Sequence, residues 1–137
     1  MNVRRFLDTN ILLYAISENP RETRKREISR RLVIGENLGI STQVLGEFYV
    51  NATRKLQPVI SHEEAIELMR KMDHFEVQQI NKEIVWTALA IKEVFAISYW
   101  DAQIVAAAHT MGCGEILSED LADGQNYAGV SVHNPFG

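Results

Sequence analysis

The chain has 137 residues, the size of one domain, and with 46% apolar and 23% charged residues its composition is ordinary for a globular protein. No apolar run approaches the roughly 20 residues that a membrane span needs, and the N-terminus lacks a signal-peptide pattern. The single cysteine excludes an internal disulfide and fits a reducing compartment. We therefore expect one cytoplasmic domain over residues 1–137, with no membrane partner.

Strands and helices are predicted to alternate along almost the whole chain. In chain order we predict a strand over 3–7, helices over 11–16 and 20–34, a strand over 38–40, helices over 43–56 and 62–74, a strand over 75–80, helices over 82–95 and 99–111, and strands over 115–117 and 130–132. Such alternation predicts an α/β fold, a three-layer α/β/α sandwich around a mainly parallel sheet.

Capping residues support several of these helix starts. Thr9 or Asn10 is expected to cap the first helix, and Ser98 is expected to cap the last one. Ser61 followed by Glu64 has the spacing of a capping box, in which each side chain satisfies a backbone N–H of the first turn.

The charge is distributed unevenly. Residues 1–31 hold eight Lys or Arg against four acids, whereas residues 32–137 hold six against fourteen. The basic helix carries the candidate RNA-binding residues Arg21, Arg24, Lys25, Arg26, Arg30 and Arg31. A basic face on an acidic protein can attract a polyanion, although a merely solvated helix face explains the same pattern.

Four carboxylates, those of Asp8, Glu47, Asp101 and Asp120, stand among mostly apolar or small residues. An ionised carboxylate is costly to bury unless a positive group compensates it. Because the four are far apart in sequence, only a tertiary fold could bring them together. If it does, a hard divalent cation would satisfy them.

Two of the acids follow predicted strands. Asp8 ends the first strand, and Asp120 lies in the loop after the strand over 115–117, so both are expected at the carboxyl edge of the sheet, where α/β proteins build their sites. A helix cap explains Asp8 equally well, and a turn explains Asp120. Glu119 and Asp123 compete with Asp120 for the same role.

The other two acids lie on predicted helices. Asp101 projects with Val105 along the apolar stripe, whereas Gln103 is expected on the opposite face. Glu47 lies off the apolar stripe of its helix, where an ion pair with Arg54 or Lys55 is the structural alternative. Oxygen ligands of this kind favour Mg²⁺ or Mn²⁺, and one or two such ions can activate water toward a phosphodiester.

These motifs together resemble the PIN-domain family, and more narrowly the toxin nuclease of a VapBC-type toxin–antitoxin pair. The resemblance is carried by LDTN after the first strand, the isolated Glu of LGEFYV, SYWDAQIVAAA, ILSEDL and a short NPF tail, and it covers essentially the whole chain. It implies that Asp8, Glu47, Asp101 and Asp120 form the catalytic, metal-holding quartet. Its supporting polar positions fall on Thr9, Asn10 and Ser118.

The resemblance further implies a five-stranded sheet of order 3-2-1-4-5 and Mg²⁺- or Mn²⁺-dependent cleavage of single-stranded or structured RNA. It also implies a homodimer, and a small antitoxin whose C-terminal segment crosses the active site. A housekeeping RNA-processing nuclease and a catalytically inert RNA- or partner-binding module remain alternatives. A dehalogenase-type phosphatase is disfavoured because Asn10 stands where it needs a second acid. Trp86 and Trp100 are interpreted as core or interface anchors rather than base-stacking platforms.

Overall fold

Six short strands form one sheet in the computed structural model, which describes residues 4–137. They are β1 (Arg5–Leu7), β2 (Leu38–Ser41), β3 (Glu76–Gln78), β4 (Glu115–Leu117), β5 (Asn126–Tyr127) and β6 (Val130–His133). Their order is β3-β2-β1-β4-β6-β5, and every pairing is parallel except that of β5 with β6. The predicted order 3-2-1-4-5 is confirmed with β6 as its fifth strand. The prediction of five strands missed β5, because two residues carry no periodic pattern.

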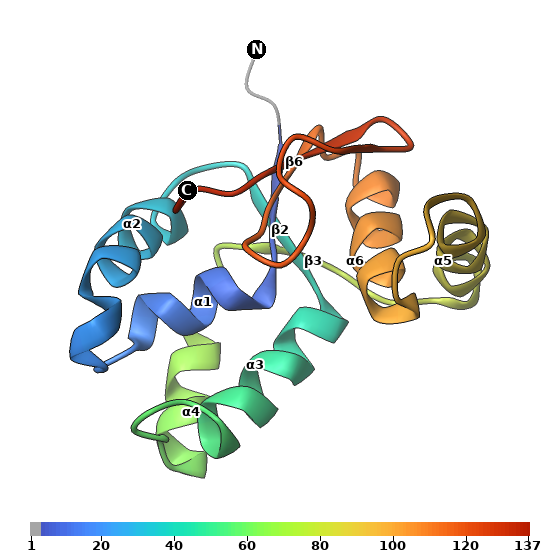
Figure 1. Cartoon of the computed structure of the whole chain (residues 1–137). Helices are drawn as coiled ribbons and strands as arrows, with labels where there is room; N and C mark the ends of the chain where they lie inside the picture. Colours follow the sequence, from blue (N-terminus) through green and yellow to red (C-terminus); the bar gives the residue numbers. More distant parts are fainter. Residues whose placement is uncertain (1–3) are drawn as a thin grey trace.

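Helices cover both faces of the sheet, so the predicted three-layer arrangement is confirmed (Figure 1). They are α1 (Thr9–Ile16), the 3₁₀ turn η1 (Pro20–Glu22), α2 (Thr23–Val33), α3 (Thr42–Arg54), α4 (His62–Arg70), α5 (Lys82–Phe95) and α6 (Tyr99–Thr110). Helices α1 to α4 lie on one side, and α5 and α6 lie on the other (Figure 1). No helix in the described part of the chain is long and apolar enough to cross a membrane.

Some predicted boundaries were wrong. The basic helix does not begin at residue 20, because Asn19 caps a 3₁₀ turn through the N–H of Arg21 and the α-helix starts only at Thr23. Helix α4 ends at Arg70, four residues early, and turns lead from there to the buried Phe75. Val3, which was assigned to the first strand, lies outside the described residues. The predicted bounds of α5 and β4 are confirmed.

Two of the polar residues singled out in the sequence, Asp8 and Ser118, directly follow strands β1 and β4 at the carboxyl edge of the sheet. The backbone N–H of Asp8 donates to the carbonyl of Leu117 at 3.0 Å, so the ends of the central strands β1 and β4 are joined. Helix α6 packs against this part of the sheet with all of residues 102–108 buried, and its alanines permit close approach. The strand order runs outward in both directions from β1, which makes this edge a topological switch point.

Candidate active site at the carboxyl edge of the sheet

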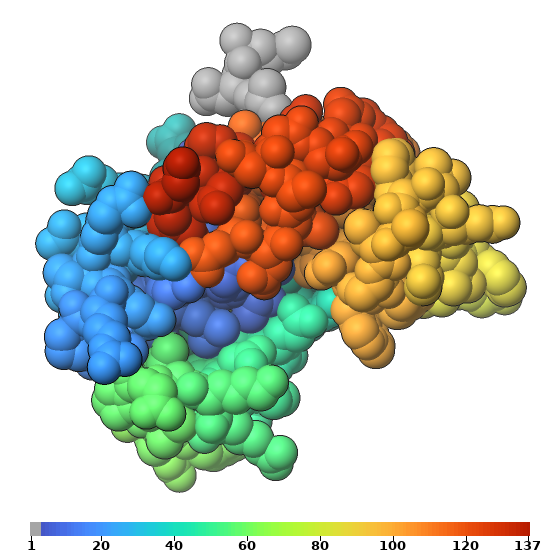
Figure 2. Space-filling model, in the orientation of Figure 1, coloured from blue at the N-terminus to red at the C-terminus, as the bar shows by residue number. Residues whose placement is uncertain are grey.

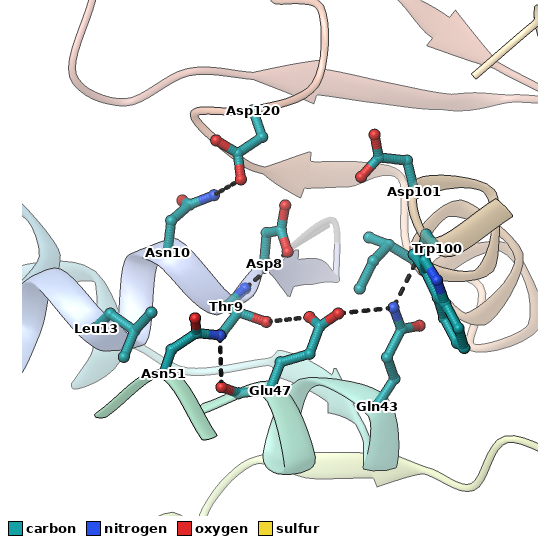
Figure 3. A pocket seen from close by; sticks show the side chains of 11 residues that line it. Asp8, Thr9, Asn10, Leu13, Gln43, Glu47, Asn51, Trp100, Asp101 and Asp120 are labelled. Atoms are coloured by element: carbon teal, nitrogen blue, oxygen red, sulfur yellow. Dashed lines mark hydrogen bonds between the residues drawn. The ribbon is translucent and has the colours of Figure 1, made fainter. Parts of the chain in front are cut away.

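A cavity of about 250 Å³, called the acidic pocket below, opens where β1, α1, α3, α6 and the loop after β4 meet. The space-filling view is hollowed where these blue, teal, gold and orange-red segments meet (Figure 2). Its lining residues are Asp8, Thr9, Asn10, Leu13, Gln43, Glu47, Asn51, Trp100, Asp101, Ile104 and Asp120. The fold therefore brings all four predicted acids to one cavity (Figure 3).

Asp8 lies at the base of the pocket and is only 6% exposed. It is also the N-cap of α1, where Thr9 or Asn10 was predicted, because its Oδ1 accepts from the N–H of Thr9 at 2.7 Å. Its Oδ2 accepts from the Ser118 hydroxyl at 2.7 Å. Burial raises the pKa of Asp8 to about 6, against these two hydrogen bonds, and the nearby charges of Asp120 and Glu47 add to the rise.

Glu47 extends from α3 into the pocket and is held through both carboxylate oxygens. The Thr9 hydroxyl donates to Oε1 at 2.7 Å, and the Gln43 amide donates to Oε2 at 3.1 Å. Asn51, one turn further along, donates to the Glu47 backbone carbonyl at 2.7 Å. The Glu47 carboxylate therefore accepts hydrogen bonds from hydroxyl and amide groups. The described residues show no ion pair from Glu47 to Arg54 or Lys55.

Gln43 belongs to a polar chain that the sequence did not reveal. The amide of Gln103 donates to Gln43 Oε1 at 2.8 Å, and the Tyr99 hydroxyl donates to Gln103 Oε1 at 2.6 Å. Gln103 was expected on the outer face of its helix, but it is 5% exposed. The prediction was wrong because a buried amide is tolerated wherever both of its ends find partners. The chain connects the first turn of α6 to Glu47.

Asp101 enters the pocket from the first turn of α6, whose N-cap Ser98 accepts from the Asp101 N–H at 3.0 Å. The predicted cap and the predicted inward direction of Asp101 are both confirmed. Burial raises the pKa of Asp101, opposed by a hydrogen bond with Ser98, and the charges of Asp120 and Glu47 raise it further.

The loop after β4 turns its acids in different directions. Asp120 lines the acidic pocket, and its Oδ2 accepts from the Asn10 amide at 3.2 Å. Asp123 instead accepts from the backbone N–H of Asn134 at 2.9 Å. Buried Ser118 accepts from the N–H of Asp120 at 3.1 Å while it donates to Asp8. The side chains of the three supporting residues Thr9, Asn10 and Ser118 thus each donate a hydrogen bond to the carboxylate of one pocket acid, those of Glu47, Asp120 and Asp8 respectively.

Glu119 belongs to a separate group, called here the Lys25–Glu119 cluster, of Tyr14, Lys25, Glu119 and Phe136. Lys25 donates to one Glu119 oxygen, and the Tyr14 hydroxyl donates to the other at 2.5 Å. The ammonium also lies 5.0 Å from the ring centre of Tyr14 and 5.7 Å from that of Phe136. Although burial alone would raise the pKa of Glu119, bonding to Lys25 and Tyr14 lowers it overall.

The cations of the basic helix largely bond within the protein. Arg24 donates to the carbonyl of Phe136 at 2.8 Å, Arg30 donates to that of Ala15 at 2.8 Å, and Arg26 donates to that of Ser17 at 3.3 Å. None of the six predicted RNA-binding cations is among the residues that line the acidic pocket.

The two tryptophans are not core residues, contrary to one of their predicted roles. Trp86 is 64% exposed on α5, and Trp100 is 61% exposed beside the acidic pocket. Their exposure depends on how α5 and α6 pack, and this information is absent from the local sequence.

The potential metal ligands in the acidic pocket suit a hard divalent cation, since they are carboxylate, amide and hydroxyl oxygens. Within residues 4–137, however, no three His, Cys, Asp or Glu side chains are grouped closely enough to hold a metal ion together. Mg²⁺ usually retains several waters and takes only one or two carboxylates directly. The donor set therefore fits a hydrated ion, with Asp8, Glu47, Asp101 and Asp120 as its candidate ligands.

The family of this chain follows from its sequence match. The PIN domain model matches residues 5–122, most of the chain. The chain belongs to the PIN-domain family. No curated protein sequence shows significant similarity to it.

Several solved structures share the PIN fold. A toxin–antitoxin complex from Klebsiella pneumoniae matches with 19% identity and a TM-score of 0.73, over 96% of this chain and 98% of that one. VapBC2 from Rickettsia felis, bound to a promoter DNA fragment, matches with 16% identity and a TM-score of 0.67, over 95% and 97%. VapC20 from Mycobacterium tuberculosis, a sarcin–ricin loop cleaving toxin, matches with 18% identity and a TM-score of 0.66, over 85% and 91%. At these identities the likeness establishes the fold.

Proposed function

We propose that this PIN-domain protein is a divalent-metal-dependent endoribonuclease and the toxin of a type II toxin–antitoxin pair. The observation that carries the proposal is the convergence of Asp8, Glu47, Asp101 and Asp120 on one cavity. Each is held by a polar neighbour, and among residues 4–137 neither Lys nor Arg lines the cavity to neutralise them. A site with this balance suits a cation between protein and phosphate.

The role of each pocket acid would follow from its position in the site. Asp8 is the most deeply buried of the four acids and is oriented through both oxygens, which makes it the fixed reference of the site. Glu47 extends into the pocket from α3 and Asp101 extends into it from α6. Asp120 lines the pocket from the loop after β4 (Figure 3). One or two Mg²⁺ or Mn²⁺ ions, when bound, would neutralise the phosphate and generate hydroxide from water near neutral pH.

The toxin assignment rests on the solved structures that share this fold. Structures of the same fold include toxin–antitoxin complexes from Klebsiella pneumoniae and Rickettsia felis and the RNA-cleaving toxin VapC20. By this likeness the partners of the chain would be RNA, a small antitoxin and a second copy of itself, with or without a larger antitoxin assembly. The compartment would be the cytoplasm.

The decisive experiment is RNA cleavage by the purified protein in EDTA, Mg²⁺ and Mn²⁺, compared with Asp101→Asn. Cleavage only with a divalent ion, lost in Asp101→Asn, is expected. Cleavage that is indifferent to EDTA would contradict the metal site, and its absence under every condition would leave an inert binding module. Sequencing of RNA 5′ ends after induced expression, with Asp8→Asn as control, would identify the RNA.

The toxin assignment needs its own test. Growth arrest on induction, relieved by co-expression of a small protein encoded beside this one, is expected of a toxin. Nuclease activity without growth arrest would instead indicate a housekeeping RNA-processing enzyme.

A further inference from the structure

An acidic pocket must bind a polyanion against electrostatic repulsion. In the part of the chain that the structure describes, four acids line it and no Lys or Arg does. The nearest basic helix has several of its cations bonded to protein carbonyls or to Glu119. A metal ion can bind the phosphate, but little else at the pocket attracts the backbone of RNA. Affinity from the uncharged parts of the nucleotide is therefore needed.

Trp100 is placed to provide such affinity. It precedes Asp101 in the first turn of α6, lines the pocket and is 61% exposed. Figure 3 shows its indole beside Gln43 on the α6 side of the cavity, across from Leu13 and Asn51. Most of the indole surface lies outside the core, so burial within this chain does not account for a large aromatic side chain at this position.

The indole is also held in place. Its ring lies 5.1 Å from that of Tyr99 at an interplanar angle of 79°, an edge-to-face contact. The backbone carbonyl of Trp100 accepts from the Gln43 amide at 3.2 Å. Because Gln43 also bonds to Glu47, the position of Trp100 is coupled to that of the acids. A platform fixed in this way loses little entropy on binding a flat partner.

We propose that Trp100 is a substrate-binding residue that stacks on an unpaired nucleobase of RNA next to the phosphate at the acids. The inference rests on the proposed ribonuclease function and adds to it a residue that contacts a base of the RNA. Every base offers a π-face, so a single indole selects for unpaired bases rather than for one sequence.

Trp86 provides a matched control. It is 64% exposed, nearly the same as Trp100, but it lies on α5 and does not line the pocket. We expect Trp100→Ala to raise KM and the Kd for RNA by about 10- to 100-fold, the range found when base-stacking aromatics are truncated. The kcat should stay within a few fold. Trp86→Ala should change neither constant, and Trp100→Phe should restore most of the loss.

The measurements are cleavage kinetics on a labelled single-stranded oligoribonucleotide and fluorescence anisotropy of the same labelled strand, with binding measured in an Asp8→Asn background. Replacing the nucleotide beside the cut with an abasic one should remove the difference between wild type and Trp100→Ala, as a double-mutant cycle requires. The ratio of the two Kd values should also be nearly independent of salt, unlike a phosphate contact.

Several outcomes would overturn the proposal. Unchanged KM and Kd in Trp100→Ala, with cleavage intact, would remove the stacking role alone. A parallel shift in oligomeric state by light scattering would reassign Trp100 to an interface between copies. A loss on an abasic strand as large as on the intact strand would show that no base is contacted. Failure of the wild type to bind or cleave RNA would refute the proposed function and the stacking role with it.

Discussion

The acidic pocket and the Lys25–Glu119 cluster lie next to each other at the carboxyl edge of the sheet and treat carboxylates in opposite ways. In the pocket, Asp8 is buried with neutral partners and neighbouring negative charges, and its pKa rises to about 6. In the cluster, Glu119 has an ammonium and a phenol within bonding reach, and its pKa falls. Glu119 and Asp120 are adjacent in sequence, yet they belong to different environments. Asp8 therefore has no positive partner in the described part of the chain and could be compensated by a bound cation, whereas Glu119 is already compensated by Lys25.

The largest expected effect tests this division through catalysis. If the chain is the proposed nuclease, Asp8→Asn should lower kcat by about 1,000-fold, because it removes a carboxylate that would orient an ion worth several kcal/mol to the transition state. Glu119→Gln should cost less than about tenfold, since its carboxylate points to Lys25. Single-turnover RNA cleavage measures both. Equal losses would show that the two acids serve the same site.

A second test uses pH. The pKa of Asp8 in the folded protein, about 6, lies above its ordinary value of 3.8, so the folded state binds the proton more tightly. The tighter proton binding of the folded state adds up to about 3 kcal/mol to the free energy of unfolding. This contribution is fully present below about pH 4 and is lost as the pH rises through 6. Urea unfolding at several pH values should show that the advantage of Asp8→Asn over wild type grows between pH 4 and 7. A constant difference would contradict the burial argument.

A third test adds the cation. Asp101→Asn should stabilise the metal-free protein by up to about 1 kcal/mol, a modest value because the side chain is half-exposed and screened by water. Mn²⁺ should raise the Tm of the wild type more than that of this variant. Asp73→Asn, at an exposed turn, is the matched control and should change neither property. A variant that gains no stability, in a protein that Mn²⁺ does not stabilise, would argue against the metal site.

The smallest expected effect belongs to the cluster. Lys25→Met should destabilise the protein by roughly 1 kcal/mol, and the double-mutant cycle with Glu119→Gln should give a coupling of about 0.5–1 kcal/mol. Arg70 and Glu67 form an ion pair on α4 with side chains that are 73% and 66% exposed, and their cycle should give a coupling nearer zero. Thermal unfolding can resolve the two. Equal coupling energies would mean that the lower exposure of Lys25 and Glu119 does not strengthen their ion pair.

The sequence predicted the elements best where one periodic pattern had clear ends. Helix α5 and strand β4 agree with their predicted bounds, and Ser61 and Ser98 cap as expected. The short strand β5 and the 3₁₀ turn at Pro20 could not be predicted in this way, because each is too short to show a period.

The site was predicted one acid at a time, and its missing parts are tertiary. Asp8 was treated as either a cap or a functional residue, but its two oxygens allow both roles. The hydrogen bond between Gln43 and Gln103 could not be predicted because an amide pair across two helices has no local signature. The exposure of Trp100 depends in the same way on how helices pack.

The double use of Asp8 has a practical consequence for the choice of an inactive variant of this protein. Truncation to Ala would remove the acid and the N-cap of α1 together, and a lost cap typically costs about 1 kcal/mol. A null result with that variant would confuse misfolding with inactivity. Asn caps a helix about as well as Asp does and carries no charge, so Asp8→Asn is the safer choice as an inactive control.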